Sequence, residues 1–302
     1  MFVSGPKFKA QLTICLTLFA IVFTYLAYGQ SSEGTFTDVF LRFQQGVNEF
    51  EGELQTAVKT YRNSNGVELD LVAAVHMGEG QYYDTLNEYF AGRDAVLYEL
   101  VADENVRPDG SGSTGGSGLI GFIQSRLSSA LALEFQLDSI NYNRANFIHA
   151  DLEPQELESI MAAKGETFFS SFLNLVLSEI ALQEAAIKNG QQVAPAYSTA
   201  DLLRLWRAPN RQGAFKHLLG QSLASTGGNF YRSGSTLGAR ITILDDRNDA
   251  ALAELQNSLQ DPELRTLSLF YGAAHMRGLE QGVIDLGFNK ISESWLVAWK
   301  SP

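Results

Sequence analysis

A short run of apolar residues that ends in histidine occurs twice in this chain, and it constrains the fold more than any other feature. Residues 72–77 read Val-Ala-Ala-Val-His-Met, and residues 271–276 read Tyr-Gly-Ala-Ala-His-Met. Each copy ends a strand-like segment and leads into a segment with helical spacing. Two of the four histidines, His76 and His275, therefore hold equivalent places in two copies of one local pattern.

The residues before the first copy predict a helix and then a β-hairpin. Residues 38–50 carry apolar side chains close to helical spacing, which predicts a first helix. Residues 54–61 alternate, and Asn65-Gly66 is a strong signal for a hairpin turn. Residues 67–75 return as a strand that becomes continuously apolar, which is typical of a strand buried on both faces of a sheet.

Both copies predict the same order of elements, namely strand, helix and strand. After the first copy, we expect a helix over residues 80–90 and a strand over residues 95–101. The second copy predicts a strand over 266–274, a helix over 279–286 and a last strand over 295–299. Such units are normally parallel and right-handed. We therefore predict an α/β fold in which two strand–His–helix–strand halves form one mixed, mostly parallel sheet.

The region between the two halves is expected to be a helical insertion at about residues 119–220. It follows a loop rich in glycine and serine, and residues 141–151 within it are predicted to be irregular. Its expected helices cover residues 119–137, a segment starting at Glu153-Pro154, and residues 166–189 and 202–219.

The first 29 residues are typical of a secretory signal peptide. Lys7 and Lys9 precede an apolar run, and small residues follow it at 27–29. We predict cleavage before Gln30, with an uncleaved N-terminal anchor as the alternative. Residues 30–302 would then form one exported domain, periplasmic or secreted, that contacts a membrane only through that segment if it is retained.

Composition limits the chemistry and the partners of the exported domain. Cys15 is the only cysteine and lies inside the predicted signal, so the mature chain would have neither disulfides nor a thiolate metal site. The formal net charge is −12, and loss of Lys7 and Lys9 with the signal would make it −14. Such a surface does not favour nucleic acid or anionic lipid as a partner.

His76, Glu99 and His275 are predicted to meet at one edge of the sheet. Ligands of parallel α/β sheets bind beyond the carboxyl ends of the strands, where both histidines are expected. Glu99 lies late in a strand whose same-face neighbours are apolar, and a carboxylate there is costly unless it is paired or binds a metal. Two histidines and a glutamate can hold a catalytic divalent metal with an open position for water. Glu79, one turn beyond His76, is a further candidate ligand or base.

A polar cluster at residues 245–248, Asp-Asp-Arg-Asn, opens a predicted helix over residues 245–259. Its acids suit a helix N-terminus, so N-capping is one interpretation. Arg247 does not suit that end, and a role in holding a carboxylate or an oxyanion is the other. His149 and His217 stand in no repeated setting and are interpreted as structural.

These motifs resemble those of the TraB/GumN/Tiki superfamily, which is related to the ChaN-like and erythromycin-esterase-like folds. The resemblance covers most of residues 52–302, and the motif-bearing ends are its most specific parts. One departure is Ala73, which stands where the first family motif usually has glycine. The match is carried by residues 71–78 with Tyr82-Tyr83 and Tyr98-Glu99-Leu100, by Gly272-Ala273-Ala274-His275 and the residues up to Leu279, and by Asp246-Arg247-Asn248.

The resemblance implies an α/β core with two halves and a metal-dependent activity, because characterised Tiki-type relatives are metal-dependent proteases. The family pattern maps the metal ligands onto His76, Glu99 and His275, the catalytic acid onto Glu99 and the catalytic basic residue onto Arg247. We therefore expect a peptidase-like hydrolase that acts outside the cytoplasm. It would use a divalent metal ion of the Mn, Co or Zn type and a peptide or protein substrate.

Two alternatives remain open at this point. One is a non-catalytic member of the same fold that binds haem or iron, as the ChaN relatives suggest, with Tyr82, Tyr83, Tyr98 or a histidine as iron ligand. The other is a member that acts through protein contacts alone.

Overall fold

The computed structural model describes residues 39–102, 107–108, 131–166, 207–227, 242 and 244–302. The predicted signal at 1–29, the glycine-rich loop at 109–118 and residues 167–189 of the helix predicted over 166–189 lie outside these ranges. Within the described residues, no helix is both long enough and apolar enough to cross a membrane.

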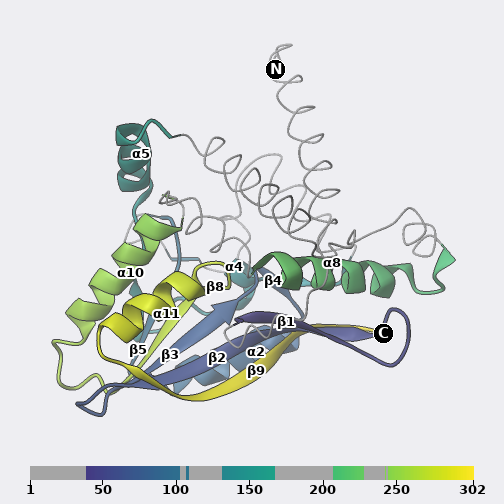
Figure 1. Ribbon diagram of the computed structural model, residues 1–302, viewed down its shortest axis with the longest axis horizontal. Helices are drawn as coiled ribbons and strands as arrows, with labels where there is room; N and C mark the ends of the chain where they lie inside the picture. The colour runs from purple at the N-terminus through teal and green to yellow at the C-terminus, as the bar shows by residue number, and fades with distance from the viewer. Residues whose placement is uncertain (1–38, 103–106, 109–130, 167–206, 228–241, 243) are drawn as a thin grey trace, which may run out of the picture.

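A mixed sheet of seven described strands forms the centre of the molecule (Figure 1). The order along it is β1-β2-β3-β8-β5-β7, and β9 also pairs with β2. β2 is antiparallel to β1, β3 and β9, whereas β3, β8, β5 and β7 pair in parallel. β2 therefore runs against all the other strands, and the predicted mixed, mostly parallel α/β sheet is confirmed. The strands are β1 (Leu41–Gln45), β2 (Gly52–Arg62), β3 (Glu68–Ala74), β5 (Ala95–Tyr98), β7 (Phe147–His149), β8 (Thr266–Gly272) and β9 (Asn289–Ser301).

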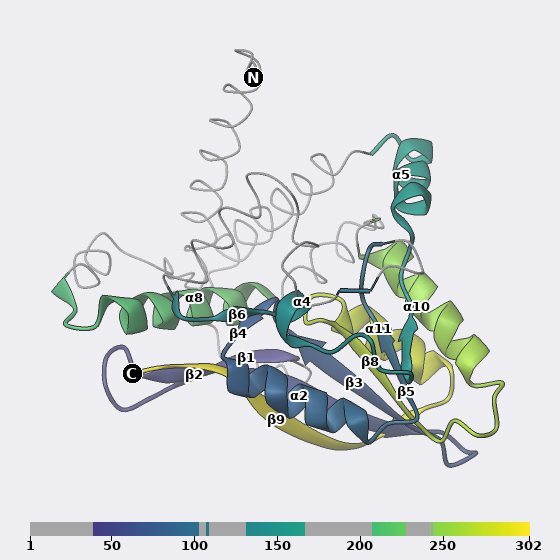
Figure 2. The same ribbon diagram turned by 180° about the vertical axis from the view of Figure 1, so that it is seen from behind.

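Helices cover both faces of this sheet. α2 (Gly80–Ala91) lies on one face, and α10 (Asp245–Ser258) and α11 (Met276–Asp285) lie on the other, as the two opposite views in Figures 1 and 2 show. Alternate residues of β3 face the two helical layers, since successive side chains of a strand point to opposite faces. Val72 and Ala74 belong to the core that includes α2, and Leu71 and Ala73 to the core that includes α10 and α11.

The hairpin and the helices next to each histidine agree with the sequence predictions. β2 and β3 pair around a turn in which Gly66 has φ of 75°, a left-handed conformation that glycine adopts without strain. α2 follows His76 and α11 follows His275, as predicted. The predicted helix from 245 is α10, and the predicted start at Glu153-Pro154 is the capping box of α5 (Pro154–Ala163).

The last strand is longer than predicted and occupies the edge beyond β2. β9 covers residues 289–301 and pairs with β2 over its whole length, with two shifts in register. α8 (Arg211–Gly227) begins inside the helix predicted over 202–219 and lies near β1, β2 and β9.

Three sequence predictions are wrong. Residue 38 of the helix predicted over 38–50 lies outside the described residues, and residues 41–45 form β1 instead of a helix. The edge of β2 supplies a hydrogen-bonding partner for them, and so short an apolar run is compatible with strand spacing as well as helical spacing. Residues 119–130 of the helix predicted over 119–137 lie outside the described residues, and the rest is not one helix. Ala132 has φ of 50°, and residues 134–135 form β6 (Glu134–Phe135) before the short helix α4 (Gln136–Ser139). β6 pairs with β4 (Met77–Gly78), directly after His76.

The third error concerns residues 141–151, predicted to be irregular. Residues 147–149 are β7, which pairs in parallel with β5 in the central sheet. The segment between the two histidine-bearing parts is therefore not a purely helical insertion. This strand carries the chain to Asp151, a residue of the candidate site.

Candidate functional site

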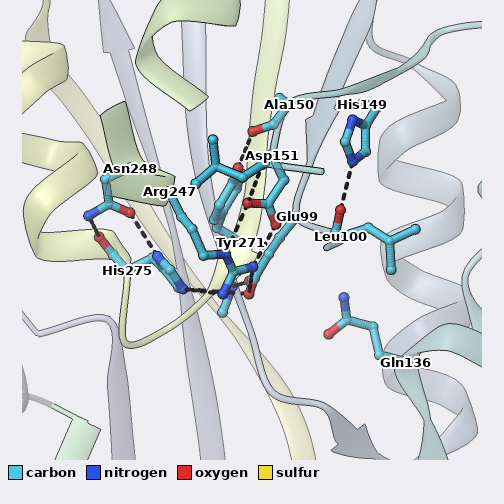
Figure 3. Close-up of polar contacts among 12 residues, drawn as sticks. Glu99, Leu100, Gln136, His149, Ala150, Asp151, Arg247, Asn248, Tyr271 and His275 are labelled. Carbon is cyan, nitrogen blue, oxygen red and sulfur yellow. Dashed lines mark hydrogen bonds and ion pairs between the residues drawn. The ribbon is translucent and has the colours of Figure 1, made fainter. Parts of the chain in front are cut away.

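The parallel strands bring four polar segments to one edge of the sheet. β3 leads to His76, β5 ends directly before Glu99, and β8 leads to His275. β7 leads to Asp151 at the same edge. Because these strands run in one direction, their carboxyl ends meet, and Figure 3 shows Glu99, Asp151 and His275 turned toward one another around Arg247.

Glu99 is held in its ionised form at the centre of this edge. Its Oε1 accepts a hydrogen bond from Arg247 Nη2 at 2.7 Å, and its Oε2 accepts one from the backbone N–H of Gly272 at 2.6 Å. Burial would raise the pKa of Glu99, but His275, Arg247, His76 and the Gly272 N–H together bring the pKa below its usual value.

His275 stands at the start of α11 and is held in one tautomer. Its Nδ1 lies 2.8 Å from Asn248 Oδ1, and Asn248 Nδ2 donates to the backbone oxygen of His275 at 3.3 Å. The second bond orients the amide, so Nδ1 must carry the hydrogen that Oδ1 accepts. Nε2 then carries a lone pair instead of a hydrogen, and it faces Arg247 Nη1 at 3.4 Å and Glu99 Oε1 at 3.5 Å.

Burial keeps the His275 ring neutral. Burial lowers the pKa of His275 to about 4. Glu99 acts to raise this pKa, and Arg247 acts to lower it further. The ring is therefore uncharged at neutral pH, with Nε2 directed at the carboxylate. A neutral imidazole whose other nitrogen donates to an oxygen is the form that binds metals or accepts a proton.

Arg247 links two carboxylates that come from different strands. Its Nε donates to Asp151 Oδ1 at 2.9 Å, and its Nη2 donates to Asp151 Oδ2 at 2.6 Å as well as to Glu99. The Asp151 side chain has no exposed surface. Burial would lower the pKa of Arg247, but Glu99 and Asp151 outweigh it and the pKa is raised. A fixed positive charge therefore sits between two buried acids.

His76 lies near Gly272 and is exposed to solvent. A Cβ added at Gly272 would lie 3.2 Å from Glu99 Oε2 and 3.9 Å from both Cε1 and Nε2 of His76. Glycine at 272 thus gives the carboxylate room beside its backbone. Ala73, the departure from the family motif, is fully buried in the α10 and α11 core, and the residue paired with Gly272 is Ala74.

Three parts of the site were not predicted from the sequence, namely Asp151, the amide of Asn248 and the Gly272 N–H. Asp151 follows the apolar run Phe147-Ile148 and, like Glu99, marks the end of a buried strand. That signal was present in the sequence, but the run is too short to separate a strand from irregular structure.

The other candidate residues have partners elsewhere. Glu79 Oε1 lies 2.9 Å from Lys216 Nζ and accepts the Lys300 N–H, so the structure does not place it with the site. The ring of His149 contacts the Leu100 oxygen at 2.6 Å. His217 packs its ring edge-on against Phe43 and Phe50, and Asp246 pairs with Lys164 at 2.5 Å.

The donor set suits a divalent cation in its chemistry. Among the described residues, no three histidine, cysteine or acidic side chains already converge closely enough to share one ion. Glu99 and His275 form a close pair, and His76 is the exposed member of the predicted set. Glu99, Asp151 and Arg247 together leave one net negative charge, which favours a cation.

The chain was compared with protein-family models, with curated proteins and with solved structures. None of the three comparisons found a match.

Proposed function

We propose that this chain is a metal-dependent hydrolase of the TraB/GumN/Tiki type that is exported from the cytoplasm and cleaves peptide or protein substrates. One observation carries the proposal: the neutral Nε2 of His275 lies 3.5 Å from the ionised Glu99 at the carboxyl edge of the sheet. In this proposal the two strand–His–helix–strand segments are halves of one domain. The N-terminal segment is a signal or a retained anchor.

His76, Glu99 and His275 would hold the divalent ion, of the Mn, Co or Zn type. When bound, such an ion acidifies a water molecule and polarises the bond to be cleaved. Glu99 supplies an ionised carboxylate that is fixed by the Gly272 N–H, and His275 supplies a lone pair whose direction Asn248 fixes. These second contacts orient the donors before a ligand arrives.

Arg247 would stabilise negative charge that develops on the substrate. Its guanidinium is largely buried, permanently charged and anchored by two hydrogen bonds to Asp151. A donor held in place by such bonds needs little reorganisation when charge develops next to it. The bonds of Arg247 to Asp151 and Glu99 are those of a residue that holds carboxylates, and the oxyanion role is proposed in addition.

The haem or iron alternative has less support. Tyr82, Tyr83 and Tyr98 are buried in the core beside α2. The hydroxyl of Tyr82 contacts Thr56 Oγ1, and that of Tyr83 donates to the Val75 oxygen. Burial raises the pKa of all three hydroxyls, which disfavours the phenolate form that iron prefers. No observation favours the other alternative, a protein that acts through protein contacts alone.

Elemental analysis of purified full-length protein tests the proposal. We expect one divalent ion per chain after growth with Mn, Co or Zn, and its loss in both His76→Ala and His275→Ala. Glu79→Gln is the matched control and should keep the ion, because Glu79 pairs with Lys216. Cleavage of a mixed peptide library, followed by mass spectrometry, should depend on the same ion. Absence of a bound ion under every metal supply would exclude the proposal.

A further inference from the structure

Arg247 occupies the two lone pairs that a divalent ion would need. Its Nη2 donates to Glu99 Oε1 at 2.7 Å, and its Nη1 lies 3.4 Å from the Nε2 of His275. Because Nδ1 of His275 carries the hydrogen, Nε2 is the ring's only acceptor. A guanidinium and a metal ion cannot both use that lone pair.

Asp151 is a second hydrogen-bonding partner for Arg247. The Nη2 group is shared between Glu99 Oε1 and Asp151 Oδ2, and Nε adds a further bond to Asp151 Oδ1. If the contacts with Glu99 and His275 break, two charge-assisted bonds to Asp151 remain. A buried charge that loses its only partner is strongly destabilising, and this arrangement avoids that cost.

We propose that Arg247 is an internal cation that a divalent ion can replace. When the ion binds Glu99 and His275, Arg247 loses its contacts with both residues and remains bound to Asp151. Asp151 is then a positioning residue that controls metal affinity without touching the metal. This inference rests on the metal site of the proposed function. Its test is independent of catalysis, because it measures metal binding.

A double-mutant cycle tests the exchange. Mn²⁺ alone is titrated calorimetrically into full-length wild type, Arg247→Met, Asp151→Asn and the double variant. Removal of Arg247 ends the competition, so Arg247→Met should bind Mn²⁺ about tenfold or more tightly than wild type, the scale of one charged hydrogen bond. Asp151→Asn should weaken binding severalfold, because Arg247 then depends on Glu99 alone.

The double variant separates the exchange from simple charge effects. If Asp151 acts through Arg247, Asp151→Asn should have little effect once Arg247 is absent, so the two changes are not additive. The double variant also keeps the test informative if Arg247→Met alone does not fold. It removes the two opposite charges of Arg247 and Asp151 together and leaves Glu99 bound by the Gly272 N–H. Circular dichroism checks that each variant is folded.

Asp246→Asn is the matched control. Asp246 lies beside Arg247 on α10 but pairs with Lys164, so its removal should leave Mn²⁺ affinity at the wild-type value. Unchanged or weaker binding in both variants that lack Arg247, or strictly additive effects, would overturn the exchange while the metal site stands. Absence of Mn²⁺ binding in all four proteins of the cycle would overturn both.

Discussion

Replacement of Asn248 by leucine should destabilise the protein and release the tautomer of His275. Asn248 is buried, and its amide makes two contacts with His275, one to Nδ1 at 2.8 Å and one to the backbone oxygen at 3.3 Å. Leucine has a similar size and no polar atom. The Nδ1–H of His275 would then be left buried without an acceptor.

The expected loss follows from these two bonds. An unpartnered buried donor costs about 1–3 kcal/mol, so we expect the free energy of unfolding to fall by roughly 2 kcal/mol. The preference for a hydrogen on Nδ1 also disappears. Nε2 then carries the hydrogen in part of the molecules, directed at the positive Arg247. Loss of such a supporting contact should lower metal affinity about 10- to 100-fold if His275 is a ligand.

Urea unfolding measures the stability, and ¹⁵N-resolved NMR of the imidazoles measures the tautomer. The His275 signals are assigned by their absence in His275→Gln. Asn257→Leu is the control, because Asn257 lies exposed on the same helix and should change the unfolding free energy by less than about 0.5 kcal/mol. A hydrogen on Nε2 in the wild-type protein, or wild-type stability and tautomer in Asn248→Leu, would refute the argument.

Two further predictions concern the same edge of the sheet. The pKa of His275 falls from 6.5 to about 4 on folding, so its contribution is complete above pH 6.5 and is lost as the pH falls toward 4. The free energy of unfolding, measured in urea titrations, should fall between pH 7 and pH 5 by about 2 kcal/mol less in His275→Gln than in wild type. An equal fall in both proteins would contradict a buried, neutral His275 ring. Gly272→Ala would place a methyl 3.2 Å from Glu99 Oε2, so we expect a weaker Gly272–Glu99 bond and about 1–2 kcal/mol lower stability by thermal unfolding. Gly92→Ala is the control, because Gly92 is exposed, has an ordinary φ of −94°, and an added Cβ would lie 3.7 Å from the Tyr89 oxygen. An equal loss of stability there would contradict a specific effect on the Gly272–Glu99 bond.

Local patterns were enough to predict the central part of this fold. The apolar runs before His76 and His275 predict β3 and β8, and the helical spacing after them predicts α2 and α11. Parallel strands align their carboxyl ends, so the same patterns predict that both histidines and Glu99 lie at one edge. These features depend on residues close in sequence, whose periodicity is directly readable.

The contacts that give the edge its chemistry depend on residues far apart in sequence. Arg247 pairs with Asp151 only because β7 lies beside β5, and residues 147–149 are too few for their period to reveal a strand. β1 likewise became a strand because the edge of β2 was available to it. Apolar spacing records which side chains are buried, whereas the partner of a buried charge is decided by which strands lie next to one another. The repeated histidine pattern therefore indicates where the site lies, and the tertiary structure alone decides that Arg247 pairs there with both Asp151 and Glu99.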